Sequence, residues 1–252
     1  MENNKAIQQR VTQANRHFYD AVAHSYEEID GRRTPGLEHW LKANLQHIRS
    51  QCSGDTLLDI GAGSGLVTRC AQGLFKNRVG VDISARILNV HRRFFDFGAA
   101  ADVNQLPFAS QRFDAVTCFA VLHHLYSFEG LVAEVKRVLK PGGIFYSDHD
   151  MDASFSERFN MPLSLYRKLY NPKARYGKVS RTITPELYTL TEWQERGVNF
   201  AYLVSLFEKE GFSVKHHFHW YGLTFLTDLV FQKKHYSRGW APLCSIIAVK
   251  NS

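Results

Sequence analysis

Short apolar segments alternate with longer amphipathic segments between residues 55 and 150. The apolar segments form near-continuous runs, which is typical of strands buried on both faces of a parallel sheet. Five strands are predicted from them, over residues 56–62, 78–83, 99–103, 112–121 and 144–150. The amphipathic segments predict helices over residues 65–75, 84–95 and 127–140. The fold class is therefore α/β, with a parallel sheet that helices cover on both faces.

The segments on either side of this core have different patterns. Residues 1–50 are polar and helical in pattern, and we expect them to form an N-terminal helical segment. Residues 152–196 are rich in aromatic and basic residues, which suits a partly helical cap inserted after the fifth strand. A helix and two closing strands are predicted after it, over residues 199–212, 213–222 and 243–251. The main domain thus spans residues 51–252 and carries the cap.

The composition excludes several classes of protein. With 44% hydrophobic residues, the chain can build a sizeable core, which argues against disorder. No stretch approaches the roughly 18 apolar residues of a membrane span, and the polar first residues lack the apolar region of a signal peptide. The four cysteines are scattered singly, without the spacing of a disulfide framework or a zinc site. We therefore expect a cytoplasmic protein.

The net charge of +7 leaves two interpretations open. A basic protein can bind an anionic partner such as nucleic acid, a phosphorylated substrate or a lipid headgroup. The basic residues are, however, spread along the chain in twos and threes, which favours general surface charge.

The segment "LLDIGAGSG" follows the first predicted strand and contains Asp59, Gly61, Gly63 and Gly65. A dinucleotide-binding turn needs a further glycine where Leu66 stands, and a Walker A loop needs a lysine that is absent. A pyrophosphate at this turn would also meet the negative charge of Asp59. The turn therefore disfavours a phosphate and favours a cationic ligand.

Two further acids end the neighbouring strands. Asp82 ends the second predicted strand, where its carboxylate could bind two ribose hydroxyls. Asp102 ends the third, where it could accept a hydrogen bond from an exocyclic amine. Because ligands of open parallel sheets bind at the carboxyl ends of the strands, the three acids imply one ligand with an amino group, a ribose and an adenine-like ring.

At these positions the chain resembles the class I S-adenosylmethionine-dependent methyltransferases. The resemblance is close over about residues 50–150. Within the family, the chain is most similar to the branch that acts on small molecules and includes the ubiquinone/menaquinone C-methyltransferases. Four segments carry it in order: "LLDIGAGSG", "VGVDIS", "ADVNQLPFASQRFDAVTCFAVLHHL" and "EVKRVLKPGGIF". It implies a Rossmann-like sheet of seven strands, mostly parallel with the last strand antiparallel, and S-adenosyl-L-methionine as cofactor.

The resemblance also implies roles for individual residues. The methionine moiety would lie on the first turn and beside Phe119, the ribose on the second-strand acid, and the adenine on the third-strand acid. The cofactor-binding residues implied are Asp59, Gly61, Ala62, Gly63, Gly65, Asp82, Ile83, Asp102, Val103, Phe119 and Tyr26. Residues 1–50 would cover this site.

Methyl transfer needs alignment, exclusion of water and in some cases a general base. The candidates lie after the fourth strand, within the fifth, and in the N-terminal segment: His123, His124, Asp148, His149 and Tyr19. A histidine is the best general base among them. The double histidine could equally be a fold element, and Tyr19 and Tyr26 could be core residues.

The cap leaves its own alternatives open. Its apolar side chains suit an aromatic acceptor or packing within the cap: Phe155, Phe159, Met161, Leu165, Tyr166 and Tyr170. Its basic residues suit an acidic substrate group or a solvated face: Arg158, Arg167, Lys168, Lys173 and Arg175. Among His216, His217 and His219, strand alternation places only two on one face, so no metal site is predicted.

The leading hypothesis is an enzyme that methylates O, N or C of a small or medium-sized, apolar or aromatic acceptor. A nucleic-acid methyltransferase is the first alternative, but "CFAVLHHL" lacks the proline-aromatic motif of amino-methylating enzymes and the Pro-Cys nucleophile of pyrimidine enzymes. A non-catalytic cofactor-binding protein is the second alternative. Calorimetry with S-adenosylmethionine and salt-dependent nucleic-acid binding would separate the three.

Overall fold

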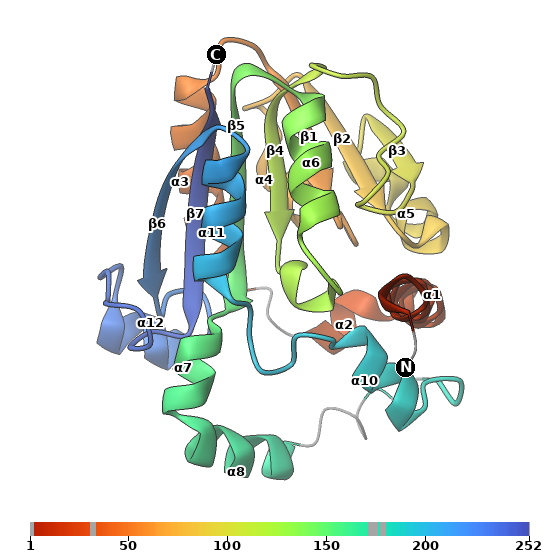
Figure 1. The fold of residues 1–252 in the computed structure, drawn as a ribbon, viewed down its shortest axis with the longest axis vertical. Helices are drawn as coiled ribbons and strands as arrows, with labels where there is room; N and C mark the ends of the chain where they lie inside the picture. The colour runs from red at the N-terminus through yellow and green to blue at the C-terminus, as the bar shows by residue number, and fades with distance from the viewer. Residues whose placement is uncertain (1–2, 31–33, 171–175, 177–179, 252) are drawn as a thin grey trace.

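The structure is a computed structural model that describes residues 3–30, 34–170, 176 and 180–251 (Figure 1). Seven strands form one sheet in the order β3-β2-β1-β4-β5-β7-β6. β7 runs antiparallel to both of its neighbours, and the remaining pairs are parallel. The predicted fold class, a mostly parallel sheet whose last strand is antiparallel, is confirmed. The strands are β1 (Thr56–Ile60), β2 (Asn77–Asp82), β3 (Phe97–Ala100), β4 (Phe113–Phe119), β5 (Leu139–Met151), β6 (Phe212–His219) and β7 (Leu243–Lys250).

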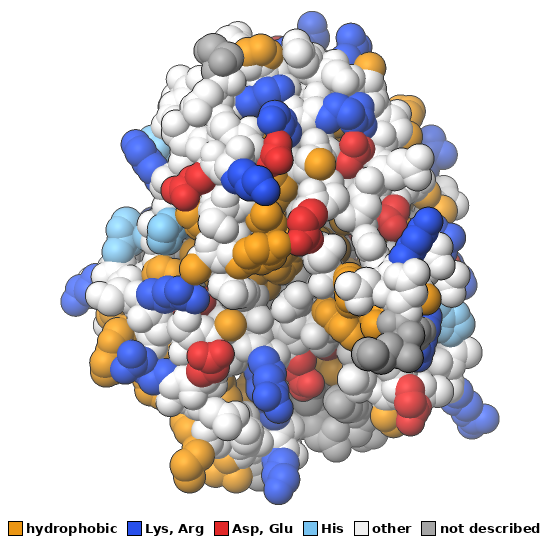
Figure 2. Space-filling view, in the orientation of Figure 1, with side chains coloured by type: hydrophobic (Ala, Val, Ile, Leu, Met, Phe, Trp, Pro, Cys, Tyr) orange, Lys and Arg blue, Asp and Glu red, His pale blue; other side chains and the backbone are white. Residues whose placement is uncertain are grey.

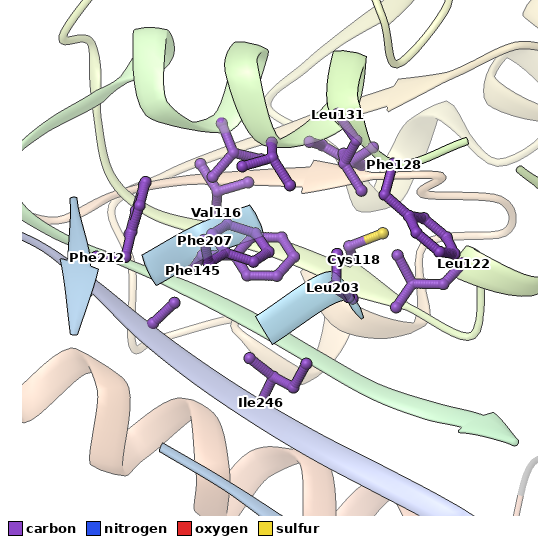
Figure 3. Close-up of a cluster of buried hydrophobic side chains, with 14 of the residues drawn as sticks. Val116, Cys118, Leu122, Phe128, Leu131, Phe145, Leu203, Phe207, Phe212 and Ile246 are labelled. Atoms are coloured by element: carbon purple, nitrogen blue, oxygen red, sulfur yellow. The ribbon is translucent and has the colours of Figure 1, made fainter. Parts of the chain in front are cut away.

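Helices cover both faces of the sheet (Figure 1). The helices α6 (Glu129–Val138) and α11 (Phe200–Lys209) pack on one face. The helices α3 (Pro35–Gln51) and α4 (Leu66–Cys70) pack on the other. Successive strand residues point to opposite faces, so continuous apolar strands supply both cores. In the core under α6 and α11, the Phe145 and Phe207 rings stack with centroids 4.7 Å apart (Figure 3).

Several predicted boundaries were wrong. The helix predicted over 127–140 ends at Val138, because Leu139 already pairs with Phe113 at the start of β5. The strand predicted over 99–103 is β3, which ends at Ala100, so Asp102 lies in the loop beyond it.

The helices predicted after the first two strands are also shorter. α4 covers only five residues, and Gly73 adopts a left-handed φ of +79° soon after its end. α5 (Ala85–Val90) is followed by a short 3₁₀ turn, Arg92–Phe94.

The remaining helices lie around the carboxyl ends of the strands (Figure 1). α1 (Asn4–Val22) and α2 (Tyr26–Asp30) belong to the N-terminal segment. α7 (Ala153–Arg158), α8 (Asn160–Tyr170) and α10 (Pro185–Thr191) follow β5, and α12 (Phe225–Phe231) lies between β6 and β7. No helix among the described residues is long and apolar enough to cross a bilayer.

α10 packs along α1 through an aromatic cluster. In this cluster the Phe18 ring contacts Tyr176 and Tyr188 edge-on, at centroid distances of 5.2 and 6.2 Å. The segment after β5 therefore contacts the N-terminal helix α1 through α10.

Candidate active site

A cavity opens at the carboxyl ends of β1, β2 and β4, beneath α1 and α2. It holds about 1170 Å³, part of which is open to solvent. Every residue predicted to bind the cofactor lines this cavity except Gly65.

The glycines of the first turn allow a conformation that other residues rarely adopt. Gly61, Gly63 and Gly65 have φ angles of +69°, +51° and +79°. A Cβ on Gly61 would lie 2.4 Å from Val121, and one on Gly65 would lie 2.8 Å from Phe94. A Cβ on Gly63 would meet nothing closer than 3.8 Å, so the space above Gly63 is open to a ligand.

Asp59 lies near the end of β1, and only 2% of its surface is exposed. Its Oδ1 accepts a hydrogen bond from the Thr117 hydroxyl at 2.8 Å. Burial raises the pKa of Asp59 to about 8, because the Thr117 bond offsets only part of the desolvation and the charge of Asp82 adds to it. A positively charged ligand group would favour the ionised carboxylate.

Asp82 ends β2 and turns its carboxylate toward the same turn. Its Oδ2 accepts the Gly63 N–H and its Oδ1 accepts the Ser84 N–H, both at 2.9 Å. Burial raises the pKa of Asp82 to about 6 against these bonds. Each carboxylate oxygen can accept a second hydrogen bond, which matches a ligand with two adjacent hydroxyls.

Asp102 is the third acid that lines the cavity. Its Oδ1 accepts the backbone and side-chain N–H groups of Asn104, at 2.9 and 2.7 Å. Its Oδ2 accepts the Thr12 hydroxyl at 3.3 Å, which joins α1 to this edge of the site.

Tyr19 and Tyr26 close the cavity from the N-terminal side. Their ring centroids lie 5.7 Å apart, and the Tyr19 hydroxyl lies 2.7 Å from Nε2 of His124. His124 donates its Nδ1 proton to the Thr191 carbonyl at 2.8 Å, so its Nε2 accepts from Tyr19. Burial lowers the pKa of His124 to about 4. His124 is therefore neutral, and its free lone pair is used to hold Tyr19.

His149 is the other histidine that lines the cavity. Its φ of +66° is unusual for a non-glycine residue, and it lies where the β5–β7 register shifts between Ser147 and Asp150. Such a bulge re-aims a side chain. The His149 ring stacks on Phe119 with centroids 4.7 Å apart. Its Nε2 lies against Gly222 and has no hydrogen-bond partner among the described residues.

Asp148 is a buried hub beside that ring. Its Oδ1 lies 3.0 Å from Nδ1 of His149, so the carboxylate holds the proton on Nδ1 and leaves Nε2 as an acceptor. Burial opposes ionisation, but the interactions with His219 and His149 outweigh it and hold the pKa of Asp148 well below its usual range. Its remaining side-chain donors are His219, Trp40, Tyr146 and Ser245.

Those four partners were not predicted from the sequence as site residues. They come from α3, β5, β6 and β7, and three of them are separated from Asp148 by 71 to 108 positions. No local pattern connects such residues. The one available signal was the run "KHHFHWYG", whose His219 we had considered only as a metal ligand.

Other predicted residues lie outside the cavity. His123 does not line it; its Nδ1 lies 2.5 Å from Asp150, which fixes the turn after β4. No described residue of 152–196 lines it either. Lys173, Arg175 and the side chain of Tyr170 lie outside the described residues.

Two groups of three potential metal ligands occur in the described part of the chain: His123, His124 and Glu192, and Asp148, His149 and His219. In the second group, both histidines already donate N–H groups to Asp148, at 3.0 and 2.9 Å. Hydrogen bonding therefore accounts for its geometry.

Comparison with known proteins identifies the core around this cavity. Residues 58–147 match a protein-family model described as a methyltransferase domain. Residues 58–147 are therefore similar to a methyltransferase domain. The matched residues include the glycine turn and the three acids Asp59, Asp82 and Asp102.

Curated relatives share the same region. A demethylmenaquinone methyltransferase of Tropheryma whipplei (strain Twist) is 33% identical over 109 residues, which cover 42% of this chain and 45% of that protein. A ubiquinone biosynthesis O-methyltransferase of Thiobacillus denitrificans is 31% identical over 144 residues, which cover 54% and 62%. The chain thus spans about half the length of the curated relatives it matches.

Solved structures of similar fold cover more of the chain than residues 58–147. A possible histamine N-methyltransferase from Thermotoga maritima has a TM-score of 0.61 at 16% identity, covering 94% of this chain and 99% of that one. The plantazolicin methyltransferase BamL has a TM-score of 0.61 at 13% identity, covering 99% and 100%. At these identities the likeness concerns the fold alone.

Proposed function

We propose that the protein transfers a methyl group from S-adenosylmethionine to a small aromatic acceptor of the quinone-precursor type. One observation carries the proposal: two buried carboxyl groups with raised pKa values, Asp59 and Asp82, face a cavity that no described lysine or arginine lines. Such a site favours a cation with ribose hydroxyls. The acceptor class rests on the curated relatives, whose names refer to menaquinone and ubiquinone.

The residues present fit S-adenosylmethionine, which when bound supplies a methyl group on a positively charged sulfur. Asp59 would bind the amino group, and Asp82 would accept hydrogen bonds from the two ribose hydroxyls. Asp102 would accept a hydrogen bond from the adenine amine. The open space over Gly63 gives the ligand a close approach to the backbone.

The acceptor would lie beside Phe119 and His149, next to the first turn. Phe119 offers an aromatic face, and Leu37 and Val121 complete an apolar wall. An apolar wall suits a flat ring and excludes water, which strengthens electrostatic interactions within the site. We place the proton acceptor at Nε2 of His149, because Asp148 fixes the tautomer. Because Nε2 is buried against Gly222, access of the acceptor to it would require Gly222 to move.

The N-terminal helices would act as the cover of the site, through Tyr19 and Tyr26. The segment 152–196 would contribute indirectly: α10 supports α1, and the Thr191 carbonyl orients His124. Its role as a cap is thus to position the cover.

A methyl-transfer assay tests the proposed function. The purified protein is incubated with S-adenosylmethionine carrying a labelled methyl group and one of three acceptors: a substituted hydroquinone or catechol, an aliphatic amine, or tRNA. We expect label in the aromatic acceptor only. Transfer to tRNA in preference to the aromatic ring would contradict the acceptor class, and its loss at moderate salt would identify a polyanion site.

A further inference from the structure

Helix α12 carries an exposed apolar face. Phe225, Leu226, Leu229 and Val230 are 62% to 77% exposed, and the helix buries none of its residues. They are spaced at i, i+1, i+4 and i+5, which places them together on one side of the helix. Scattered exposed apolar residues are ordinary, but a contiguous group of this kind indicates an interaction surface.

Helix α8 carries a second group of exposed apolar side chains. Met161, Leu165 and Tyr166 are 84%, 61% and 59% exposed. Trp220 stacks on Phe231 of α12 at a centroid distance of 4.5 Å and contacts Phe155 of α7, the helix that precedes α8, at 5.2 Å. Figure 2 shows apolar side chains along the lower left margin of the molecule, over α12 and α8, with Lys and Arg among them. We call the seven exposed side chains, those of α12 and α8 together, the apolar face.

Basic residues outnumber acidic residues in the segments that carry the apolar face. Residues 153–170 and 222–240 contain six basic and two acidic residues. One of the acids, Asp228, already accepts the Gly222 N–H at 2.7 Å. The basic residues are Arg158, Arg167, Lys168, Lys233, Lys234 and Arg238.

We propose that the apolar face and its basic rim dock the protein on the surface of an anionic lipid bilayer. Exposed aromatic and aliphatic side chains enter the boundary between headgroups and acyl chains, while flanking lysines and arginines bind the lipid phosphates. The charge ratio favours this occupant over a second copy of the chain, because two basic rims would repel each other. The proposal does not depend on the proposed activity.

The docking surface lies next to the candidate active site. α12 begins three residues after Gly222, which covers Nε2 of His149. A bilayer under α12 would therefore lie close to the segment that covers Nε2 of His149.

Co-sedimentation with vesicles tests the docking surface without cofactor or acceptor. Vesicles of phosphatidylcholine alone are compared with vesicles containing phosphatidylglycerol, at low and high salt. We expect the wild-type chain to bind the anionic vesicles, to dissociate at high salt, and to bind neutral vesicles weakly. The double variant Lys233→Glu/Lys234→Glu should weaken binding at least about tenfold, since each basic residue near an anionic surface strengthens binding about fivefold.

The apolar contribution has its own matched variants. Leu226→Ser/Val230→Ser should lose vesicle binding, whereas Phe97→Ser, which alters a similarly exposed side chain on β3, should bind as the wild type does. Equal binding by wild type and Leu226→Ser/Val230→Ser would overturn the proposal. Light scattering that shows a dimer, lost in the same double variant, would also overturn it in favour of a second copy.

Discussion

Replacing Asp59 by asparagine is expected to weaken S-adenosylmethionine binding by roughly ten- to hundredfold, which corresponds to one lost charge-assisted hydrogen bond. The amide keeps the size of the carboxyl group and can still accept the Thr117 hydroxyl bond, but it offers no negative charge to a cation. Isothermal titration calorimetry measures the change in affinity. The control is Asp96→Asn, the same substitution at an acid that pairs with Arg78 outside the cavity, and it should bind normally.

The same variant should have the opposite effect on the stability of the ligand-free protein. Burial raises the pKa of Asp59 to about 8, so the folded state holds this proton more tightly than the unfolded chain does. The stability contributed by the protonated group is complete below about pH 4 and is lost as the pH rises through 8. Asp59→Asn never ionises, and its melting temperature at pH 8 should equal or exceed that of the wild type. A melting temperature of Asp59→Asn below that of the wild type at pH 8 would contradict this account.

Replacing His149 by asparagine is expected to lower the turnover number by about 10²- to 10⁴-fold, the usual contribution of a general base. Asparagine tolerates the left-handed backbone at this position, so the bulge in β5 can persist. The affinity for S-adenosylmethionine should change little, because the cofactor's acids are untouched.

His216→Asn is the matched control for that experiment. His216 is exposed on β6, two positions before Phe218, and does not line the cavity. Its rate should match the wild type. A His149→Asn variant with normal turnover would remove His149 from the mechanism.

The sequence predicted those features of the fold that local patterns determine. Alternating apolar and amphipathic segments predicted the sheet, because each strand is buried on both faces. The strand-end acids were expected to meet, since parallel strands place their carboxyl ends at one edge, and the structure places Asp59, Asp82 and Asp102 around one cavity. Their binding roles stay predictions.

The features that the sequence did not predict depend on contacts between residues far apart in the chain. The Asp148 hub joins Trp40, His219 and Ser245, which have no common sequence pattern. The early start of β5 depends on pairing between Leu139 and Phe113, which overrides the helical pattern that continues to Lys140. Short-range periodicity cannot report either kind of interaction.

Proton release on binding tests the central claim most directly, that buried acids of this cavity hold a cationic methyl donor. With the pKa of Asp59 near 8 and that of Asp82 near 6, Asp59 is mostly protonated at pH 7 in the ligand-free protein. Calorimetric titrations of the wild type with S-adenosylmethionine at pH 7, in two buffers of different ionisation enthalpy, measure the protons exchanged. The account predicts tight binding with release of about one proton, and an affinity that rises as the pH increases from 6 to 8. Absence of binding, or binding with no proton released, would contradict it.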